Sequence, residues 1–395
     1  MAVEKINIER FLALAKVHPV IDVRSPGEYN HAHIPGAFNL PLFTDEERKV
    51  VGTAYKQEGR EKAIKIGLDY FGPKMNKMIE DVQSAILNQQ SAKSNRQNAK
   101  PDDAQLPIAD CILLYCWRGG MRSAGVAWLL DLYGCKVYTL LGGYKKFRNH
   151  VLGTFKSPFQ FNILGGYTGS GKTEVLKKLR EDGAFVVDLE AIANHKGSAF
   201  GNIGLPPQPS QEMFENLLYH ELRALSDQSN TEISITPFRG LGGIWLEDES
   251  QRIGLVNIPN DIWNQMRQSA LYFLEIPFEE RLKYIISEYG SLDREKMTDA
   301  IKRIREKLGG LNAKNAIEFL QWGDIEGCFR ILLAYYDKYY LKALHNRESL
   351  DALLYRIDCK SVTPENARKL VRQTQYLRKA TMPSTLESPI GPQKP

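Results

Sequence analysis

The segment Cys111-Ile-Leu-Leu-Tyr-Cys-Trp-Arg-Gly-Gly-Met-Arg-Ser123 is followed by the amphipathic run 124–133. The apolar residues before Cys116 predict a buried strand, and residues 124–133 predict a helix. Between them lies a glycine-containing loop with Arg118 and Arg122, whose backbone is free to turn its N–H groups inward. A strand, an anion-binding loop and a helix N-terminus around one cysteine stabilise a thiolate. Cys116 is therefore the predicted nucleophile, with both arginines beside it.

Four further residues complete this loop and are expected to line the anion site: Trp117, Gly119, Gly120 and Met121. Cys111 and Cys135 lie on strand-like patterns and are interpreted as buried structural thiols. The loop has the spacing Cys-x₅-Arg from Cys116 to Arg122. By itself it indicates an activated thiolate in an anion site, which suits a sulfur carrier and a phosphatase equally.

The bulk properties bound the class of protein. A chain of 395 residues is longer than a domain with a single hydrophobic core usually is, so two domains are expected. Its net charge of +5 permits an anionic partner without requiring one. No apolar run approaches the roughly 20 residues that span a bilayer, and the N-terminus lacks a signal peptide's apolar core, so we expect a cytoplasmic protein with no membrane contact. The five cysteines form no Cys-x-x-Cys pair, so neither a structural metal nor a disulfide framework is expected.

Alternating strand and helix patterns predict an α/β domain with a parallel sheet over residues 1–145. This domain carries an insertion at about 44–107, to which no role is assigned. Thr44-Asp-Glu-Glu47 has the capping-box pattern, and interrupted helical periodicity continues from there to about Gln89. Residues 91–105 are polar without an apolar period and predict a mobile loop.

A basic linker is expected at 146–158, followed by a second α/β domain over 159–362. From Phe278 to about Arg378 the pattern is helical throughout. Residues 363–395 are expected to form a C-terminal helix and a disordered tail, because the last residues are rich in proline. The strands predicted for this domain are 159–164, 183–188, 233–236, 243–246 and 270–275.

Residues 166–173 match the phosphate loop G-x-x-x-x-G-K-[ST]. They read Gly166-Tyr167-Thr168-Gly169-Ser170-Gly171-Lys172-Thr173, after a predicted strand and before a predicted helix. The glycines let the backbone wrap phosphate oxygens, Lys172 supplies a positive charge, and the Thr173 hydroxyl is suited to hold Mg²⁺. A nucleotide is the usual ligand, but any pyrophosphate would satisfy the same groups.

Acidic side chains follow two predicted strands near this loop, and a carboxylate in such a place usually orients Mg²⁺. Asp188 and Glu190 follow one strand, and Glu247-Asp248-Glu249 follows another. Spacing does not choose between the two groups, and either has a solvated acidic turn as its alternative. Further candidates for a phosphate clamp or for acid–base chemistry are Arg239, Arg252 and His195, each with an ordinary structural role as its alternative.

Two helical segments have features of RNA-binding surfaces. Residues 302–307 carry four positive charges, and residues 335–340 place tyrosines beside a lysine. A solvated helix face and a packed tyrosine stripe explain the same residues, and taken alone the segments favour this second interpretation.

Several motifs carry a resemblance to known families. Asp22-Val-Arg-Ser-Pro-Gly-Glu-Tyr29, His33-Ile-Pro-Gly-Ala37 and the Cys116 loop resemble a rhodanese domain, which carries sulfur as a cysteine persulfide. With the segments 141–145, 188–198 and 246–250, the chain resembles the tRNA 2-selenouridine synthase family over roughly residues 10–360. The implied fold class is α/β, with an N-terminal rhodanese-like parallel-sheet domain and a C-terminal P-loop NTPase-like α/β domain with a helical extension.

The resemblance implies a tRNA-modifying transferase. Such an enzyme acts on 2-thiouridine at the wobble position of the anticodon and replaces the sulfur by selenium. Its implied co-substrates are geranyl diphosphate, which forms an S-geranyl intermediate, and selenophosphate, for which a supplying enzyme is a possible partner. On this interpretation the P-loop holds the prenyl diphosphate with Mg²⁺, and Cys116 accepts selenium as a perselenide.

The sequence departs from the usual rhodanese pattern in loop length, since Cys-x₅-Arg is one residue longer than the common Cys-x₄-Arg. A wider loop suits a tetrahedral anion, and our hypothesis is that it fits selenophosphate. A Cys-x₅-Arg phosphatase fused to a P-loop kinase is the first alternative function. An RNA-binding adaptor without activity is the second, and the intact Cys116 loop and P-loop both argue against it.

Overall fold

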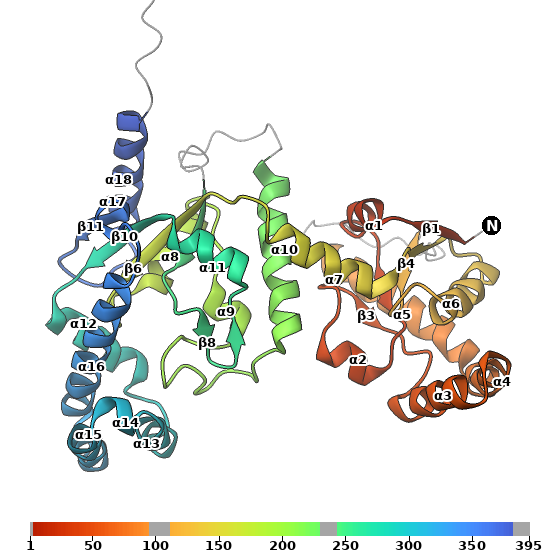
Figure 1. Ribbon diagram of the computed structural model, residues 1–395, viewed down its shortest axis with the longest axis horizontal. Helices are drawn as coiled ribbons and strands as arrows, with labels where there is room; N and C mark the ends of the chain where they lie inside the picture. Colours follow the sequence, from red (N-terminus) through yellow and green to blue (C-terminus); the bar gives the residue numbers. More distant parts are fainter. Residues whose placement is uncertain (1–2, 95–110, 230–242, 382–395) are drawn as a thin grey trace, which may run out of the picture. The chain divides into compact units, whose positions relative to one another are not determined.

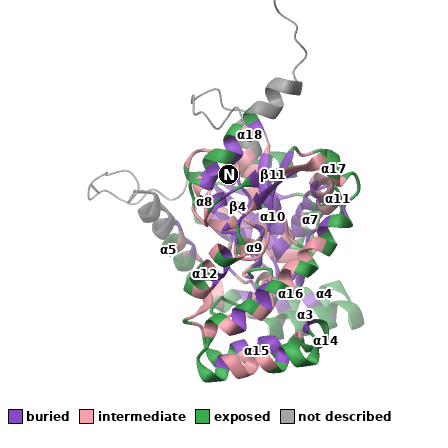
Figure 2. Ribbon diagram, turned by 90° about the vertical axis from the view of Figure 1, so that its left-hand side faces the viewer, coloured by how far each residue is buried: buried purple, intermediate pink, exposed green. Residues whose placement is uncertain are grey.

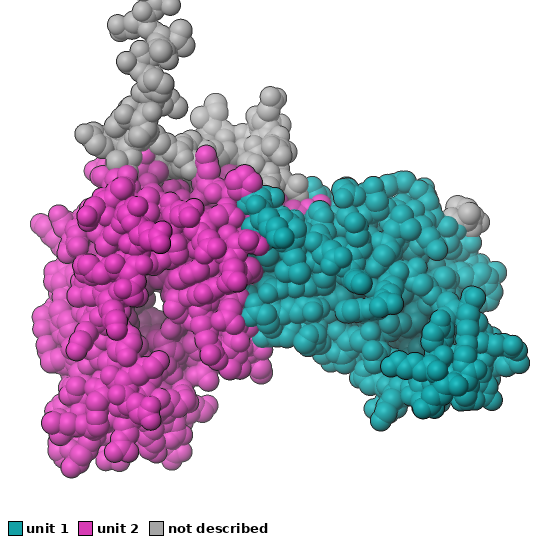
Figure 3. Space-filling view, viewed as in Figure 1, with its two compact units in different colours: residues 1–157, 209–220 teal, residues 158–208, 221–395 magenta. Residues whose placement is uncertain are grey.

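A computed structural model of the chain describes residues 3–94, 111–229 and 243–381. The chain forms two compact units, the first from residues 1–157 and 209–220 and the second from 158–208 and 221–395 (Figure 3). Each unit has its own parallel sheet, so the α/β class predicted from the sequence is confirmed. Buried residues gather on the strands, and exposed residues lie on the outer faces of the helices (Figure 2).

Unit 1 is built on a five-stranded parallel sheet in the order β1-β5-β4-β2-β3. The central strand β4 pairs with β5 on one side and with β2 on the other, so the predicted cysteine-bearing strand lies in the middle of the sheet. All four residues of β4 are buried because both faces of the sheet are covered. The bounds are β1 Glu4–Ile6, β2 Val20–Asp22, β3 Phe38–Asn39, β4 Ile112–Tyr115 and β5 Val137–Leu140.

Helices cover both faces of this sheet (Figure 1). On one face, α1 (Ile8–Leu14) and α7 (Gly143–Thr154) pack together, and the rings of Phe11 and Tyr144 lie against Tyr115 of β4. On the other face, α6 (Met121–Leu132) joins the main core of the unit. Residues 146–158, predicted as a linker, are therefore mostly helix α7, whose buried Phe147 and Val151 attach it to unit 1.

The insertion after β3 contains helices whose apolar faces complete the core of unit 1. Phe71, Met78, Val82 and Ile86 are buried in the same cluster as α6. The predicted capping box is confirmed, since the Thr44 hydroxyl accepts a hydrogen bond from the N–H of Glu47 at 3.2 Å. The predicted mobile loop begins inside α5, and residues 95–105 lie outside the described residues. The bounds are α2 Pro26–His31, α3 Asp45–Gln57, α4 Arg60–Phe71, η1 Gly72–Lys74 and α5 Met75–Ser94.

Unit 2 is built on a four-stranded parallel sheet in the order β11-β10-β6-β7. Three of the strands were predicted, but β11 was not, because the sequence after residue 278 was interpreted as helical throughout. The segment predicted as a strand at 183–188 forms only an isolated bridge between Val186 and Trp245. The predicted strand at 233–236 lies outside the described residues. The bounds are β6 Phe161–Gly166, β7 Ile244–Glu247, β10 Ala270–Glu275 and β11 Leu354–Asp358.

The helices of unit 2 form a layer on each face of its sheet. α8 (Lys172–Glu181) and α18 (Asn366–Thr381) share one core with the sheet. α11 (Asn260–Arg267) and α16 (Ile325–His345) lie on the opposite face, where Tyr340 packs against Phe273 of β10. A separate core joins α16 to the helical extension, which comprises α12 Phe278–Tyr289, α13 Arg294–Arg303, α14 Arg305–Leu308 and α15 Gly310–Trp322.

The remaining elements are short, apart from α10 (Gln211–Ser229), whose first residues belong to unit 1 and whose later residues belong to unit 2. Within the described ranges, no helix is long and apolar enough to cross a membrane. The short elements are α9 Leu189–Ala193, β8 Arg252–Ile253, β9 Val256–Asn257 and α17 Leu350–Leu353.

Candidate functional site

Cys116 lies in unit 1, directly after β4 and at the start of the loop that leads into α6. Its side chain is 3% exposed. The Sγ atom accepts a hydrogen bond from the backbone N–H of Gly120 at 3.3 Å, and the Ser123 hydroxyl lies 3.3 Å away. α6 begins at Met121, so the sulfur faces the N-terminus of a helix, where exposed N–H groups favour negative charge.

The electrostatics of this loop favour the thiolate. Burial alone would raise the pKa of the Cys116 thiol, but hydrogen bonds from Ser123 and the charge of Arg122 lower it below its usual value. The other thiols whose pKa is perturbed behave in the opposite way, because burial raises the pKa of Cys135, Cys328 and Cys359. Cys116 is thus the cysteine of this chain best suited to act as a nucleophile.

The Gly142-Gly143 turn packs against the backbone of the Cys116 loop. Gly143 has a positive φ of 58°, and a Cβ there would lie 2.3 Å from the carbonyl oxygen of Cys116. The N–H of Tyr144 donates to that oxygen at 2.8 Å, and the N–H of Lys145 donates to the oxygen of Trp117 at 3.0 Å. The motif at 141–145 therefore shapes the loop, a role that the sequence alone did not assign.

The loop arginines differ in their surroundings. Arg122 forms two hydrogen bonds with Glu28, at 2.6 and 3.3 Å, and Glu28 also pairs with Arg48 at 2.9 Å. Burial would raise the pKa of Glu28, but these two arginines lower it, so the carboxylate stays charged. Arg118 is exposed, and its backbone N–H rather than its side chain acts on the thiol. The sequence did not single out Glu28, which lies 94 residues from Arg122.

The predicted phosphate loop lies in unit 2 between β6 and α8, as its motif requires. Gly169 and Gly171 have φ values of 80° and 68°, which favour glycine. The Lys172 ammonium donates to the carbonyl oxygen of Gly166 at 3.3 Å and lies 4.0 Å from Glu247. Burial would lower the pKa of Lys172, but Glu247 and its acidic neighbours raise it, so the lysine is charged.

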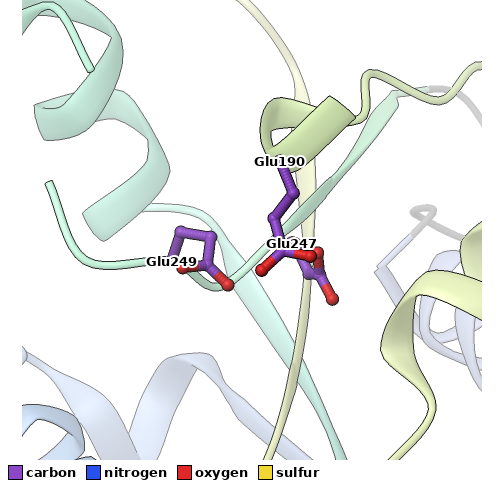
Figure 4. Close-up of side chains that lie close together, drawn as sticks. All are labelled: Glu190, Glu247 and Glu249. Carbon is purple, nitrogen blue, oxygen red and sulfur yellow. The ribbon is translucent and has the colours of Figure 1, made fainter. Parts of the chain in front are cut away.

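Three carboxylates face one another beside this loop (Figure 4). Glu190 comes from α9, Glu247 from the end of β7 and Glu249 from the segment after it, and one oxygen of each lies within 4.8 Å of the others. Among the described residues, Oε2 of Glu247 has no hydrogen-bond partner. Burial and the negative charge of Glu247 raise the pKa of Glu190 to about 10 and that of Glu249 to about 8. Such carboxyl groups would release their protons when a cation binds to the cluster.

The residue types in this cluster fit a hard divalent cation. Three carboxylates and the hydroxyl of Thr173, which lies 3.4 Å from Glu247, form an all-oxygen donor set. Oxygen ligands of this kind suit Mg²⁺, which prefers to share carboxylates with a bound phosphate. Buried carboxylates with strongly raised pKa values are also the groups that a bound cation would most stabilise.

The other acidic candidates serve different purposes. Asp188 caps α9, where its carboxylate accepts the N–H of Ala191 at 2.9 Å. Asp248 accepts hydrogen bonds from Tyr340 at 2.6 Å and from Arg347 at 3.0 Å. The structure therefore brings Glu190 and Glu247 together, whereas Asp188 and Asp248 are engaged in other hydrogen bonds and are not part of the group within 4.8 Å.

Of the remaining candidates, the two that the structure describes, His195 and Arg252, do not line the P-loop cavity. His195 is nearly buried between Gly201 and Gly254, its Nδ1 lacks a partner among the described residues, and burial lowers its pKa. Arg252 is exposed on β8, where its Nε donates to the oxygen of Gly254 at 2.9 Å. Arg239 lies outside the described residues.

A cavity of about 870 Å³ opens from the P-loop and the three glutamates. Aromatic side chains from α12 and α16 line its wall. The predicted tyrosine stripe on α16 therefore faces the cavity. Some of its polar groups are already paired, since the hydroxyl of Tyr336 accepts the N–H of Ala199 at 3.2 Å. The cavity thus offers a phosphate end and a wall with several aromatic side chains, a combination that suits an organic diphosphate.

Comparison with known proteins finds a matching family for each of the two parts of the chain. Residues 159–365 match the family described as tRNA 2-selenouridine synthase AAA domain, and residues 8–150 match the rhodanese-like domain family. A protein named tRNA 2-selenouridine synthase from Sulfurovum sp. is 36% identical over 77% of this chain and 79% of its own length. The protein of that name from Hydrogenovibrio crunogenus is 35% identical over 74% of this chain and 76% of its own. The one from Bdellovibrio bacteriovorus is 31% identical over 83% of this chain and 89% of its own. The two domain types that the motifs resembled are thereby confirmed.

Proposed function

The chain belongs to the tRNA 2-selenouridine synthase family, and we propose that it converts 2-thiouridine at the wobble position of tRNA into 2-selenouridine. It acts as a transferase with geranyl diphosphate and selenophosphate as donors. The observation that carries the proposal is the presence in one chain of a thiol with a lowered pKa and a P-loop beside three carboxylates. Each half of the reaction then has its own site.

Alkylation of the RNA takes place at the P-loop. The glycine-rich backbone and Lys172 bind the diphosphate of the donor and stabilise the pyrophosphate that leaves when the C–O bond breaks. The sulfur of 2-thiouridine attacks the carbon released, and the resulting thioether is a better leaving group than sulfide. Glu190, Glu247, Glu249 and Thr173 would hold Mg²⁺, which when bound neutralises charge on the departing pyrophosphate.

Selenium is handled at Cys116. Its lowered pKa keeps the sulfur nucleophilic at neutral pH, and the backbone around it is suited to bind the anionic donor selenophosphate. The Cys116 thiolate attacks the phosphorus of selenophosphate, so that an S–P bond forms and the P–Se bond breaks to release selenide. Selenide adds to C2 of the base, the C2–S bond breaks and geranyl thiol leaves, and water then hydrolyses the S–P bond to give phosphate and free Cys116. An enzyme that makes selenophosphate is the expected supplier. Deleting one glycine of the Cys-x₅-Arg loop should weaken selenophosphate use while alkylation continues, and undiminished selenation would contradict this role of the longer loop.

The longer loop also keeps a phosphatase in consideration as a second function. A phosphatase needs a protonated group to donate to the leaving oxygen. Among the described residues, the carboxylate that faces Arg122 is Glu28, and its lowered pKa makes it a poor acid at neutral pH. We therefore favour selenium transfer over phosphoester hydrolysis. Phosphoester hydrolysis that Cys116→Ser abolishes would reverse this preference.

Mass spectrometry of wobble nucleosides from cells with and without the gene tests the function. We expect 2-selenouridine to disappear when the gene is deleted and to return when the wild-type chain is supplied. Supplying Lys172→Ala instead should leave 2-thiouridine unalkylated, because the diphosphate site is lost. Normal selenouridine in the deletion strain would refute the proposal.

A further inference from the structure

The cavity of unit 2 extends in both directions along α16 from the P-loop. Tyr340 lies beside the P-loop, where its hydroxyl accepts a hydrogen bond from the N–H of Gly166 at 3.3 Å. Tyr336 and Ala343 also line the cavity, one turn before and one turn after it. These two residues are seven positions apart, which is about 10 Å along a helix. The cavity therefore has room beside the diphosphate site for a second ligand.

The end of the cavity near α11 is positively charged. Arg267 lines it, with a guanidinium that donates to the oxygen of Ala343 at 3.4 Å and lies 5.6 Å from the ring centroid of Trp263. Arg347 lies close behind, 4% exposed, and pairs with Asp248 at 3.0 Å. Arg267 and the indole ring of Trp263 thus form the wall at this end, and Arg347 lies behind them without lining the cavity.

Among the described residues, the positive charges of the two arginines near this end are not matched by an equal number of carboxylates. The carboxylate of Asp248 serves Arg347 through one oxygen and Tyr340 through the other. Nε and Nη1 of Arg347 are buried and have no hydrogen-bond partner among the described residues. Burial and the nearby charge of Arg347 lower the pKa of Arg267. Asp248 is thus already used by Arg347 and Tyr340, and a partly buried Arg267 beside a second arginine costs less when an anion binds to it.

We propose that Arg267, with the buried charge of Arg347 behind it, forms a second anion subsite that binds a phosphodiester of the RNA acceptor, with Trp263 stacking a neighbouring base. This inference rests on the proposed function, because it assumes that RNA must reach the P-loop cavity to be alkylated. An arginine beside an aromatic ring is a common arrangement for binding single-stranded nucleic acid. The donor's diphosphate already has the P-loop and Lys172, so the arginines are free for a different phosphate.

The test measures the binding of an anticodon stem-loop RNA with 2-thiouridine at the wobble position, without donors, at several salt concentrations. Arg267→Gln should weaken binding by at least about tenfold, the loss expected for a charge-assisted hydrogen bond. It should also reduce the slope of log K against log salt by about 0.7, the value for one phosphate contact on a single strand. Arg267→Lys should keep most of the slope, because it keeps the charge.

Two further variants separate charge from stacking and from general effects. Trp263→Ala should weaken binding while leaving the salt slope unchanged. Arg330→Gln is the matched control, because Arg330 is an exposed arginine on α16 that pairs with Glu279 and Glu326 away from the cavity. It should bind RNA like the wild type.

Binding of magnesium pyrophosphate, measured by calorimetry, reports on the P-loop and on folding. Arg267→Gln should bind it normally. Unchanged RNA affinity and salt slope in Arg267→Gln would overturn the inference. Weakened pyrophosphate binding with intact RNA binding would also overturn it, because the arginines would then serve the donor. Intact pyrophosphate binding in Lys172→Ala would instead count against the proposed function and leave the RNA subsite standing.

Discussion

Replacing Glu249 with Gln should stabilise the metal-free protein at pH 8 and weaken its binding of magnesium pyrophosphate. In the wild type, burial and the negative charge of Glu247 raise the pKa of Glu249 to about 8, so its carboxyl group keeps a proton well above the usual pH. Glutamine has the same shape and no charge, so the variant escapes this repulsion. The same change removes one of the oxygen anions that a cation needs.

The magnitude follows from the pKa of Glu249. A carboxyl group whose pKa is raised by folding destabilises the folded state as the pH rises from its unfolded to its folded pKa. The difference between 4.5 and about 8, at about 1.4 kcal/mol per pH unit, sets a ceiling of about 5 kcal/mol. Glu249 keeps some exposure, and Glu190 and Glu247 also take up protons, so we expect about 2 kcal/mol at pH 8. Near pH 4.5 the two proteins should be almost equal in stability.

Urea denaturation in EDTA at pH 5 and pH 8, followed by circular dichroism, measures this difference. Glu181→Gln is a matched control, because Glu181 is an exposed glutamate on α8 of the same unit. The gain of Glu249→Gln should appear at pH 8, shrink at pH 5, and be lost when magnesium pyrophosphate is added. A variant that is no more stable than the wild type at pH 8 in EDTA would refute the electrostatic reasoning.

Three further changes probe unit 1. Ser123→Ala should raise the pKa of Cys116, because it removes a hydrogen bond to the thiolate, and the pH dependence of alkylation of Cys116 by iodoacetamide should move to higher pH. Phe71→Ala should lower the free energy of unfolding by about 3–5 kcal/mol in urea titrations, since this side chain from the insertion is buried in the core. Glu28→Gln should release Arg122 and weaken selenophosphate-dependent selenation more than alkylation. Assays that omit one donor at a time measure the two steps separately, and equal losses in both would contradict a role confined to the thiol site.

The sequence predicted the local parts of each site well, because their residues are consecutive. The strand, loop and helix around Cys116 follow from an apolar run, two glycines and an amphipathic run, and the P-loop follows in the same way. In both places the backbone geometry depends on neighbours within a few residues. Such information is present in the sequence without any knowledge of distant contacts.

The parts that the sequence did not predict depend on contacts between distant segments. Glu28 pairs with Arg122 across 94 residues, and no local pattern joins them. The choice among the acidic residues did have a usable signal. Glu247 is the last residue of β7 and Glu249 follows two positions later, so the alternation of side chains along a strand would predict these two on one face and Asp248 on the other.

A strand that was not predicted and a segment to which no role was assigned have similar explanations. β11 was missed because its five residues follow a long helical region, and its pairing with β10 supplies the stability that its own pattern does not indicate. The insertion after residue 44 had no assigned function because its apolar residues are sparse. Phe71, Met78, Val82 and Ile86 acquire their role only when they pack against α6.

The division of labour between the two sites is tested most directly by the RNA product of the Cys116→Ala variant. The purified variant is incubated with a 2-thiouridine anticodon stem-loop, geranyl diphosphate, selenophosphate and Mg²⁺, and the nucleosides are identified by mass spectrometry. We predict that S-geranyl-2-thiouridine accumulates and that no 2-selenouridine forms, because the P-loop site is intact and the thiol is absent. Formation of 2-selenouridine, or recovery of unmodified 2-thiouridine alone, would contradict the two-site account.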